Sequence, residues 1–148
     1  MPPNQHSRQS INLPFTTVYS PSRGHRNYSW QSNTLYAFSN FGGEAYYACK
    51  VANDDTGDYF LQQLGHHNID TNVSRREDGT SGRCVVMVSP DAERTMHTYL
   101  GVSADISSKE VDFDAAKNSE YIYIEGYLVT SPDARNAVIE LKKFAEEN

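Results

Sequence analysis

The sequence lacks long apolar runs, and no segment approaches the roughly 20 consecutive apolar residues that a membrane helix requires. A secretory leader with basic, apolar and small-residue regions is also missing, so we expect neither secretion nor a membrane partner. Cysteine is scarce: Cys49 and Cys84 both lie in apolar, strand-like runs. That placement favours buried free thiols in a reducing compartment over a disulfide framework, and it predicts a cytoplasmic location.

Acidic residues are absent from residues 1–43, which contain three arginines, whereas the whole chain carries a net charge of −6. A net negative charge argues against a nucleic-acid partner, because non-specific binding requires clustered Lys and Arg. The charge asymmetry and the Pro-, Ser- and Asn-rich composition predict a boundary near residue 32. We expect residues 1–32 to form an irregular or disordered arm, with Ile11–Tyr19 at most an edge strand because Pro14 interrupts it. A nucleic-acid contact by this basic arm is the alternative.

Residues 33–148 suffice for one domain, and their pattern alternates between helical and strand-like segments. We first expect a helix that is opened by Ser32 or Asn33 and ended by Gly42-Gly43, followed by a strand at 44–51. A second helix at about 56–64, capped by Asp55 and stopped by Gly65, leads to a strand at 69–73. The remaining expected elements are a β-hairpin at 82–101, a short helix at 112–117, a buried parallel strand at 121–126 and a helix opened by Ser131-Pro132. This order predicts an α/β fold in which helices cross over between the strands of a parallel sheet.

The hairpin segment, residues 82–101, is the most informative part of the chain. Its first strand has apolar residues on both faces, so we expect it to be covered on both sides. Ser89-Pro90-Asp91-Ala92 supplies turn chemistry, and a second strand follows at 94–100. Thr95, His97 and Tyr99 give that second strand a face that can both pack and hydrogen-bond. An ordinary hairpin of a mixed sheet is the alternative to one that covers a ligand.

Several motifs of catalysis and metal binding are absent. The sequence has no Gly-x-x-x-x-Gly-Lys phosphate loop and no Gly-x-Ser-x-Gly nucleophile elbow. His66-His67, Asp70 and His97 form an alternative metal site, but adjacent histidines lack the i, i+4 spacing that aims two rings at one ion. Asp54 and Asp55 lack the alternating acidic spacing of a calcium loop. We therefore expect no metal site within this chain.

Two regions carry a family resemblance. The first consists of Asn33-Thr34-Leu35-Tyr36-Ala37, Phe41-Gly42-Gly43 and Cys49-Lys50-Val51-Ala52-Asn53-Asp54-Asp55-Thr56-Gly57. The second consists of Gly82-Arg83-Cys84-Val85-Val86, Pro90-Asp91-Ala92-Glu93-Arg94-Thr95-Met96 and Tyr99-Leu100-Gly101-Val102-Ser103-Ala104. Together they resemble the PfkB-type carbohydrate kinases of the ribokinase superfamily, in particular the adenosine-kinase and sugar-kinase branch.

The resemblance covers about residues 33–148 and implies a partial ribokinase-like fold, with a parallel sheet, helices and a small β lid hairpin. In such a fold the lid closes over a sugar or nucleoside at the edge of the sheet. ATP with Mg²⁺ then phosphorylates a hydroxymethyl group of that small molecule. These activities and cofactors are what the resemblance implies for the family.

The sequence departs from the family at two places. Tyr28-Ser29-Trp30-Gln31-Ser32 replaces the family's Gly-Gly-Ser-Ala-Ala, and bulky side chains cannot reproduce the close approach of a diglycine to substrate hydroxyls. We also expect the amino-terminal strand with its substrate-binding Asp to be missing, together with the carboxyl half that holds a Gly-Ala-Gly-Asp anion hole, the catalytic base and the ATP site. The chain is therefore expected to be an inactive kinase fragment unless the missing half complements it. The alternative is a non-catalytic remnant that binds or self-associates as a homodimer through the hairpin or a sheet edge.

The candidate site residues come from positions that match the family. Asn33 matches the Asn that contacts substrate, and Arg94 and Met96 are expected to line the lid above it. Glu125 matches the acidic residue at the end of its strand, near the metal-phosphate region, and the carboxyl ends of parallel strands are where α/β sheets bind ligands. The alternatives are a surface carboxylate for Glu125, an exposed hairpin charge for Arg94 and a core residue for Met96.

Overall fold

The computed structural model describes residues 9–12, 17–19, 26–27, 30–71, 73 and 76–148. The strands are β1 Gln9–Asn12, β2 Thr17–Tyr19, β3 Arg26–Asn27, β4 Glu44–Tyr47, β5 Ile69–Asp70, β6 Arg83–Val88, β7 Arg94–Tyr99 and β8 Ser119–Tyr123. The α-helices are α1 Trp30–Asn40, α2 Asp55–His66, α3 Phe113–Lys117 and α4 Pro132–Glu147. Short 3₁₀ helices form at η1 Gly101–Asp105, η2 Ser108–Glu110 and η3 Gly126–Thr130.

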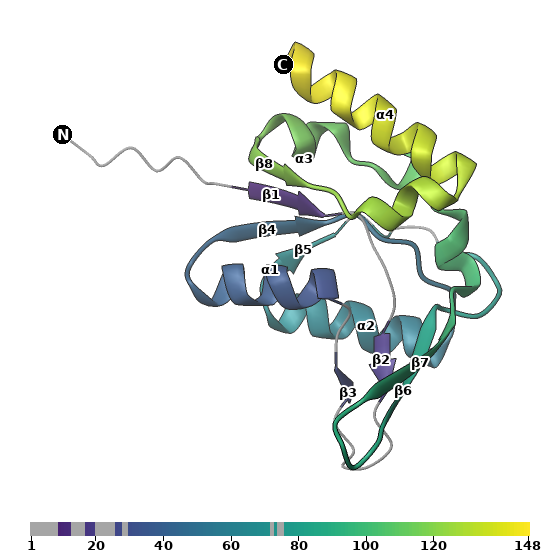
Figure 1. The fold of residues 1–148 in the computed structure, drawn as a ribbon. Coiled ribbons are helices and arrows are strands. Elements are labelled where there is room, and N and C mark those ends of the chain that lie inside the picture. Colours follow the sequence, from purple (N-terminus) through teal and green to yellow (C-terminus); the bar gives the residue numbers. More distant parts are fainter. Residues whose placement is uncertain (1–8, 13–16, 20–25, 28–29, 72, 74–75) are drawn as a thin grey trace.

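The larger sheet is parallel throughout, with the strand order β5-β4-β1-β8. Helices α1 and α2 lie on one side of it, and α3 and α4 lie on the other (Figure 1). A parallel sheet between two helical layers confirms the predicted α/β fold class.

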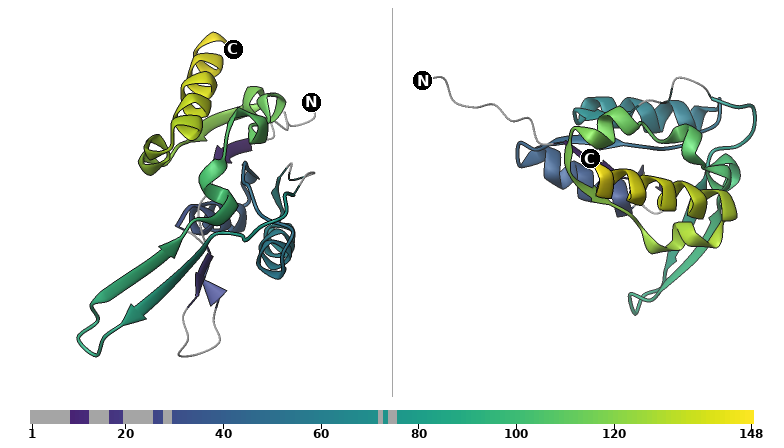
Figure 2. Two further views of the ribbon diagram at one scale, coloured as in Figure 1. Left: turned by 90° about the vertical axis from the view of Figure 1, so that its right-hand side faces the viewer. Right: turned by 90° about the horizontal axis from the view of Figure 1, so that it is seen from above.

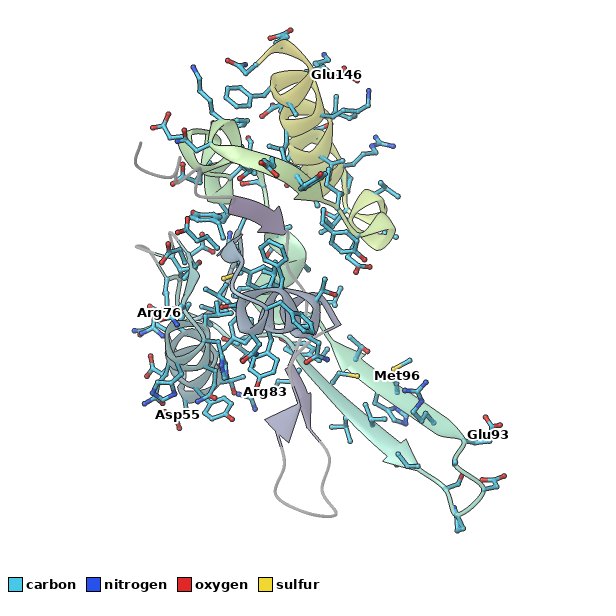
Figure 3. The ribbon with its side chains drawn as sticks, turned by 90° about the vertical axis from the view of Figure 1, so that its left-hand side faces the viewer. Asp55, Arg76, Arg83, Glu93, Met96 and Glu146 are labelled. Atoms are coloured by element: carbon cyan, nitrogen blue, oxygen red, sulfur yellow. The ribbon has the colours of Figure 1, made fainter. Side chains whose placement is uncertain are left out.

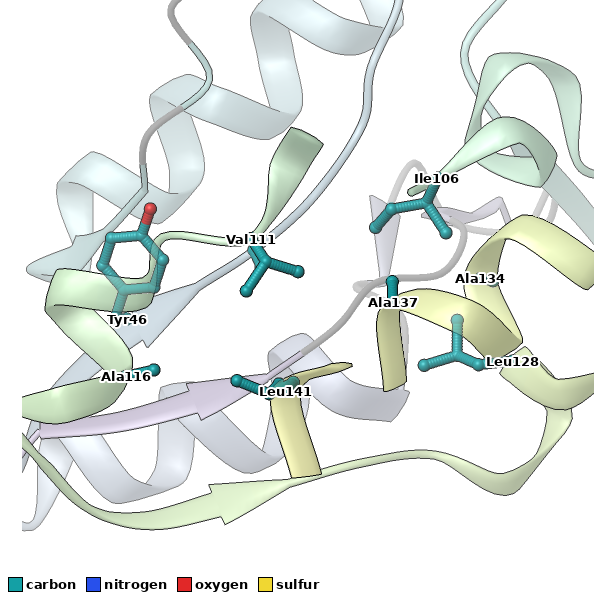
Figure 4. Packing of buried hydrophobic residues seen from close by; sticks show 9 residues of the cluster. Tyr46, Ile106, Val111, Ala116, Leu128, Ala134, Ala137 and Leu141 are labelled. Atoms are coloured by element: carbon teal, nitrogen blue, oxygen red, sulfur yellow. The ribbon is translucent and has the colours of Figure 1, made fainter. Parts of the chain in front are cut away.

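Strand β4 shows why the three layers hold together. Its side chains alternate between the two faces, so Ala45 and Tyr47 join the apolar cluster covered by α1 and α2. Tyr46 and Ala48 join the cluster on the other face, which α4 covers. Figure 4 shows this second cluster, in which Leu141 of α4 is completely buried. Alternation along one short strand therefore links both halves of the core.

The smaller sheet has the order β3-β2-β6-β7 and projects away from the larger one (Figure 2). Strands β6 and β7 form the predicted hairpin, with Val86 opposite Met96 and Val88 opposite Arg94. The turn uses the predicted residues: the Ser89 N–H donates to the Glu93 carbonyl at 3.0 Å, and Ala92 adopts a φ of 67°.

The hairpin is more exposed than the sequence predicts. Within β6 only Cys84 is buried, and every residue of β7 is exposed. The expectation of a first strand covered on both sides was wrong, because the hairpin extends beyond the helical layers (Figure 2).

Strand β1 corrects two expectations about the amino-terminal segment. It pairs with β4 on one side and with β8 on the other, so it is an inner strand and not an edge strand or an arm. An amino-terminal strand of the sheet is therefore present. Its sequence, Gln9-Ser10-Ile11-Asn12, has a single apolar residue, and such a pattern cannot identify a strand held by ladders on both edges. The boundary near residue 32 stays a prediction, because much of residues 1–29 lies outside the described ranges.

Two helix boundaries also differ from the expected ones. Helix α1 begins at Trp30, ahead of Ser32 and Asn33, and it ends at Asn40, where the predicted left-handed Gly42 follows with a φ of 86°. Helix α2 takes Asp54 as its N-cap in place of Asp55. It also continues through Gly65, so that glycine does not stop it.

Strand β8 is parallel as predicted, but it is not buried. The side chain of Tyr121 is 73% exposed and that of Tyr123 is 46% exposed, whereas Ile122 and Ile124 pack against the cluster under α4. The prediction of a buried strand was wrong because only the face of β8 that carries Ile122 and Ile124 is covered.

Both cysteines are buried and free, as predicted. Burial raises the pKa of the Cys49 thiol to about 12, although a hydrogen bond with Thr71 opposes that rise, so the thiol stays protonated at neutral pH. Within the described ranges, no helix combines the length and the apolar character needed to cross a membrane.

Candidate functional site at the root of the hairpin

The predicted site residues lie on elements that meet at one side of the molecule. The start of α1 and the carboxyl ends of β4 and β8 lie at that side (Figure 1). The root of the hairpin, where β6 begins and β7 ends, lies there too. Asn33 is an exposed residue of the first turn of α1, and Glu125 is the half-buried residue just before η3. The structure thus places the ends of these elements on one side of the molecule, and the roles of these side chains stay predictions.

Arg94 and Met96 share one face of the hairpin, because their partners across the ladder are Val88 and Val86. Met96 is 61% exposed, so the alternative that it is a core residue is wrong. Figure 3 shows Met96 part-way along the hairpin, beyond Arg83 at its root. This face combines apolar side chains with a guanidinium group, a combination that suits contact with a small polar ligand.

A hydrogen-bonded cluster around Asp54 joins the core to the root of the hairpin. The Oδ1 atom of Asp54 accepts from the Gly57 N–H at 2.9 Å and from the Ser81 hydroxyl at 2.6 Å. Its Oδ2 atom accepts from the Ser81 N–H at 3.0 Å and from Nη2 of Arg83 at 3.3 Å. Burial alone raises the pKa of the Asp54 carboxyl, but hydrogen bonds from Ser81, Gly57 and Arg83 outweigh it and hold the pKa below its usual range.

Sequence reasoning missed the role of Asp54, although a signal was present. The motif Asp54-x-x-Gly57 places an acceptor at the N-cap and a residue without a side chain three positions later. A Cβ atom on Gly57 would lie 2.3 Å from the Ala52 carbonyl oxygen, so only glycine fits there. The cap was predicted one residue too late because Asp54 and Asp55 are equally good caps by type.

The hairpin closes back on its own root at Gly101. This residue has a φ of 53°, and a Cβ on it would lie 2.0 Å from the Thr80 carbonyl oxygen. That carbonyl accepts from the Val102 N–H at 3.0 Å, which joins the chain leaving the hairpin to the chain entering it. Both ends of the hairpin are therefore fixed within a few residues of Ser81.

A second polar cluster surrounds Lys50, just after β4. Its Nζ lies 3.1 Å from Glu77 and 3.6 Å from Glu110, and it donates to the Asp105 carbonyl at 3.3 Å. Burial alone lowers the pKa of Lys50, but the two carboxylates outweigh it and raise the pKa, so the ammonium keeps its charge. The Ser103 hydroxyl also donates to the Lys50 carbonyl at 2.9 Å. These contacts tie the segment after the hairpin to the sheet.

Glu125 has a defined partner at the carboxyl end of β8. Its Oε1 accepts a hydrogen bond from the Tyr123 hydroxyl at 2.7 Å, which raises the pKa of Tyr123 because the phenolate would lose that bond. In the described part of the chain, no group of three His, Cys, Asp or Glu side chains could hold a metal ion. The described residues therefore do not fit a complete Mg²⁺–ATP site.

Comparisons with known proteins agree with this architecture. The model of the pfkB family of carbohydrate kinases matches residues 31–148. The adenosine kinase from Sinorhizobium meliloti superimposes with a TM-score of 0.82 over 96% of this chain, at 20% identity. An Escherichia coli structure described as a ribokinase II, solved with ATP and Mg²⁺, gives a TM-score of 0.81 over 96% of the chain, at 16% identity. An uncharacterized sugar kinase of Archaeoglobus fulgidus is 27% identical over 90 residues, or 61% of this chain.

The chain spans only part of these proteins. It covers 54% of the adenosine kinase, 50% of the Escherichia coli protein and 36% of the Archaeoglobus sugar kinase. At these identities the structural likeness shows a shared ribokinase-like fold over this portion.

Proposed function

Because the chain belongs to the pfkB family of carbohydrate kinases, we propose that it forms the lid-bearing half of an ATP-dependent kinase for a sugar or nucleoside hydroxyl. The supporting observation is the exposed hairpin, which projects from the side where the parallel strands end (Figure 1). Open α/β sheets bind their ligands at that side. A cytoplasmic location belongs to the same proposal, and the free buried thiols support it.

The substrate would lie between the larger sheet and the hairpin. Asn33 at the start of α1 would donate or accept at a substrate hydroxyl. Arg94 and Met96 would cover the substrate from the hairpin side, and Glu125 would face the region of the transferred phosphate. Arg94 and Met96 share one face of the hairpin, and this supports a common role.

We expect no turnover by this chain alone. Phosphoryl transfer depends on positioning and on stabilising charge around the transferred group. By the family resemblance, the anion hole, the catalytic base and the ATP site belong to the half that follows α4. The first 53 residues also contain no Asp, so β1 brings no aspartate to the substrate, and its last residue is Asn12.

The complementing half would dock beside β8. That strand ends the larger sheet, and the exposed Tyr121 and Tyr123 lie on the face that α4 does not cover. A right-handed crossover through α4 leads to a strand on the free edge of β8, since β1 occupies the other edge. Pairing there would satisfy the open ladder of β8.

The test is binding and turnover measured on the same preparation. We expect adenosine or ribose to bind in isothermal titration without conversion when Mg-ATP is added. Asn33→Ala should weaken that binding, whereas Asn40→Ala, at the other end of α1, should not. Turnover at a rate typical of an intact kinase, above about 1 s⁻¹, would contradict the missing catalytic half. Absence of binding by both ligands would contradict the substrate role.

A non-catalytic, self-associating protein is the second candidate function. The hairpin exposes Val85, Met87, Val88 and Met96, each at least 40% accessible, and such an apolar strand pair invites association. Light scattering at rising protein concentration tests this candidate. A monomer at high concentration would count against it.

A further inference from the structure

We propose that Asp54 is a positioning residue that fixes the orientation of the hairpin relative to the larger sheet. This role concerns the joint between the larger sheet and the hairpin, and it does not depend on the proposed kinase activity. Asp54 is the partly buried N-cap of α2, whereas three of its four donors belong to the segment that enters the hairpin.

The two carboxylate oxygens of Asp54 have separable tasks. Oδ1 caps α2 through the Gly57 N–H and also accepts from the Ser81 hydroxyl. Oδ2 accepts only from the hairpin entry, through the Ser81 N–H and the Arg83 guanidinium. Oδ1 therefore binds both the helix and the hairpin entry, whereas Oδ2 binds the hairpin entry alone.

The joint is stiff because each neighbour of Asp54 has a second attachment. The Ser81 hydroxyl accepts from the Ala52 N–H at 2.9 Å, which fastens it to the chain that follows β4. Gly101 and Val102 return the far end of the hairpin to Thr80. The carboxylate side chain of Asp54 is only 18% exposed, so water competes weakly for these bonds. Since its hydrogen bonds keep the pKa of Asp54 low, the acceptor is present throughout the neutral range.

Small changes at this joint are amplified along the hairpin. The strand rises roughly 3.3 Å per residue, so the turn lies about 17 Å from Arg83 and a swing of about 10° displaces it by ~3 Å. Met96, opposite Val86, lies about half-way along and would move by ~2 Å. A displacement of that size is enough to remove a side chain from contact with a ligand.

The variant Asp54→Asn tests how far the hydrogen bonds of Oδ2 hold the hairpin in place. Asparagine is an equally good N-cap and retains Oδ1 for Gly57, but its NH₂ group replaces Oδ2 and faces two donors. Asp55→Asn is the matched control. It removes the same charge from the adjacent residue, and Asp55 is not among the residues that form the hydrogen bonds of Asp54 at the hairpin root.

The measurement is a distance distribution between spin labels on the hairpin turn and on α4, introduced by Asp91→Cys and Lys143→Cys. Both positions are exposed, whereas the native thiols of Cys49 and Cys84 are buried and escape labelling. Double electron–electron resonance should give a distribution at least ~3 Å broader or shifted in Asp54→Asn, the displacement expected for a swing of about 10°. The Asp55→Asn distribution should match that of the parent, and circular dichroism should show unchanged helix content in both.

An unchanged distribution in a folded Asp54→Asn protein overturns the proposal, and so does equal broadening in Asp55→Asn. If Asp54→Asn does not fold, Arg83→Gln decides the matter, because Arg83 is 54% exposed and supplies a single bond to Oδ2. A broader distribution in Arg83→Gln supports the proposal, and an unchanged one overturns it.

Discussion

The two sheets of this protein differ in how far their strands are buried. The larger sheet lies between helical layers, and both faces of β4 are buried. In the smaller sheet, β7 is exposed along its whole length, and it is held in place by its neighbour β6 and by the bonds at the hairpin root. We infer that burial in the larger sheet contributes most of the free energy of folding, whereas the smaller sheet supplies an exposed surface for contacts.

The largest effect should follow from a cavity under α4. Leu141→Ala removes a side chain with no exposed surface, and we expect a loss of about 3 kcal/mol in the free energy of unfolding. Urea denaturation followed by circular dichroism measures it. Ile139→Ala, on the same helix but 45% exposed, is the control and should lose less than about 1 kcal/mol. Equal losses would mean that α4 is not packed as described.

A smaller effect is expected where the hairpin meets the core. Gly101→Ala forces a side chain into a left-handed backbone conformation, with the Thr80 carbonyl 2.0 Å from the new Cβ. We expect destabilisation of about 2 kcal/mol in the same urea experiment. Gly126→Ala has nothing within 4 Å of its new Cβ and should change stability by less than about 0.5 kcal/mol. A neutral Gly101→Ala would show that the hairpin root tolerates rearrangement.

The Asp54 carboxylate should make the joint sensitive to acid. Its pKa in the folded protein lies below the usual value near 3.8, so its stabilising contribution is complete above that value. The contribution is lost as the pH falls through the lower folded-state pKa. The difference in unfolding free energy between the parent and Asp54→Asn should therefore be constant from pH 7 to 5 and shrink below pH 4. A difference that grows on acidification would contradict the assigned hydrogen bonds.

The smallest effect on stability should come from the hairpin face itself. Met96 is 61% exposed, and Met96→Ala should change the unfolding free energy by less than about 0.5 kcal/mol. If this face contacts ligand as proposed, the same variant weakens binding of adenosine or ribose in titration calorimetry. Thr95→Ala, on the opposite face of β7, is the matched control for that measurement. A large loss of stability in Met96→Ala would show that the hairpin is covered in solution.

Local chemistry explains which elements could be predicted from the sequence. The hairpin turn follows from Ser89-Pro90-Asp91, and the start of α4 follows from Ser131-Pro132, because each signal lies within a few consecutive residues. Strand β1 could not be predicted in the same way, because its pairing partners β4 and β8 lie far along the chain. The exposure of Tyr121 likewise depends on which strand ends the sheet, which no local pattern reveals.

The sequence indicated candidate site residues, whose roles stay predictions, but it did not indicate the contacts around them. Matched motifs indicated Asn33, Arg94, Met96 and Glu125, and the structure brings their elements to one side of the molecule. The Asp54 cluster depends on hydrogen bonds to residues 27 and 29 positions away. The sequence cannot tell which aspartate forms these long-range hydrogen bonds, because Asp54 and Asp55 have the same side chain and are adjacent.

The inner position of β1 has a consequence for how the chain assembles during translation. Ile11 lies opposite Ile122, more than 100 positions later, so the centre of the larger sheet closes only after more than 100 further residues have been made. At ribosomal speeds of about 5–20 residues per second, β1 waits roughly 5–20 s for β8 after it has left the ribosome. During that interval β4 is the only partner it can find in the larger sheet, and its second edge is open to chaperones or to neighbouring nascent chains.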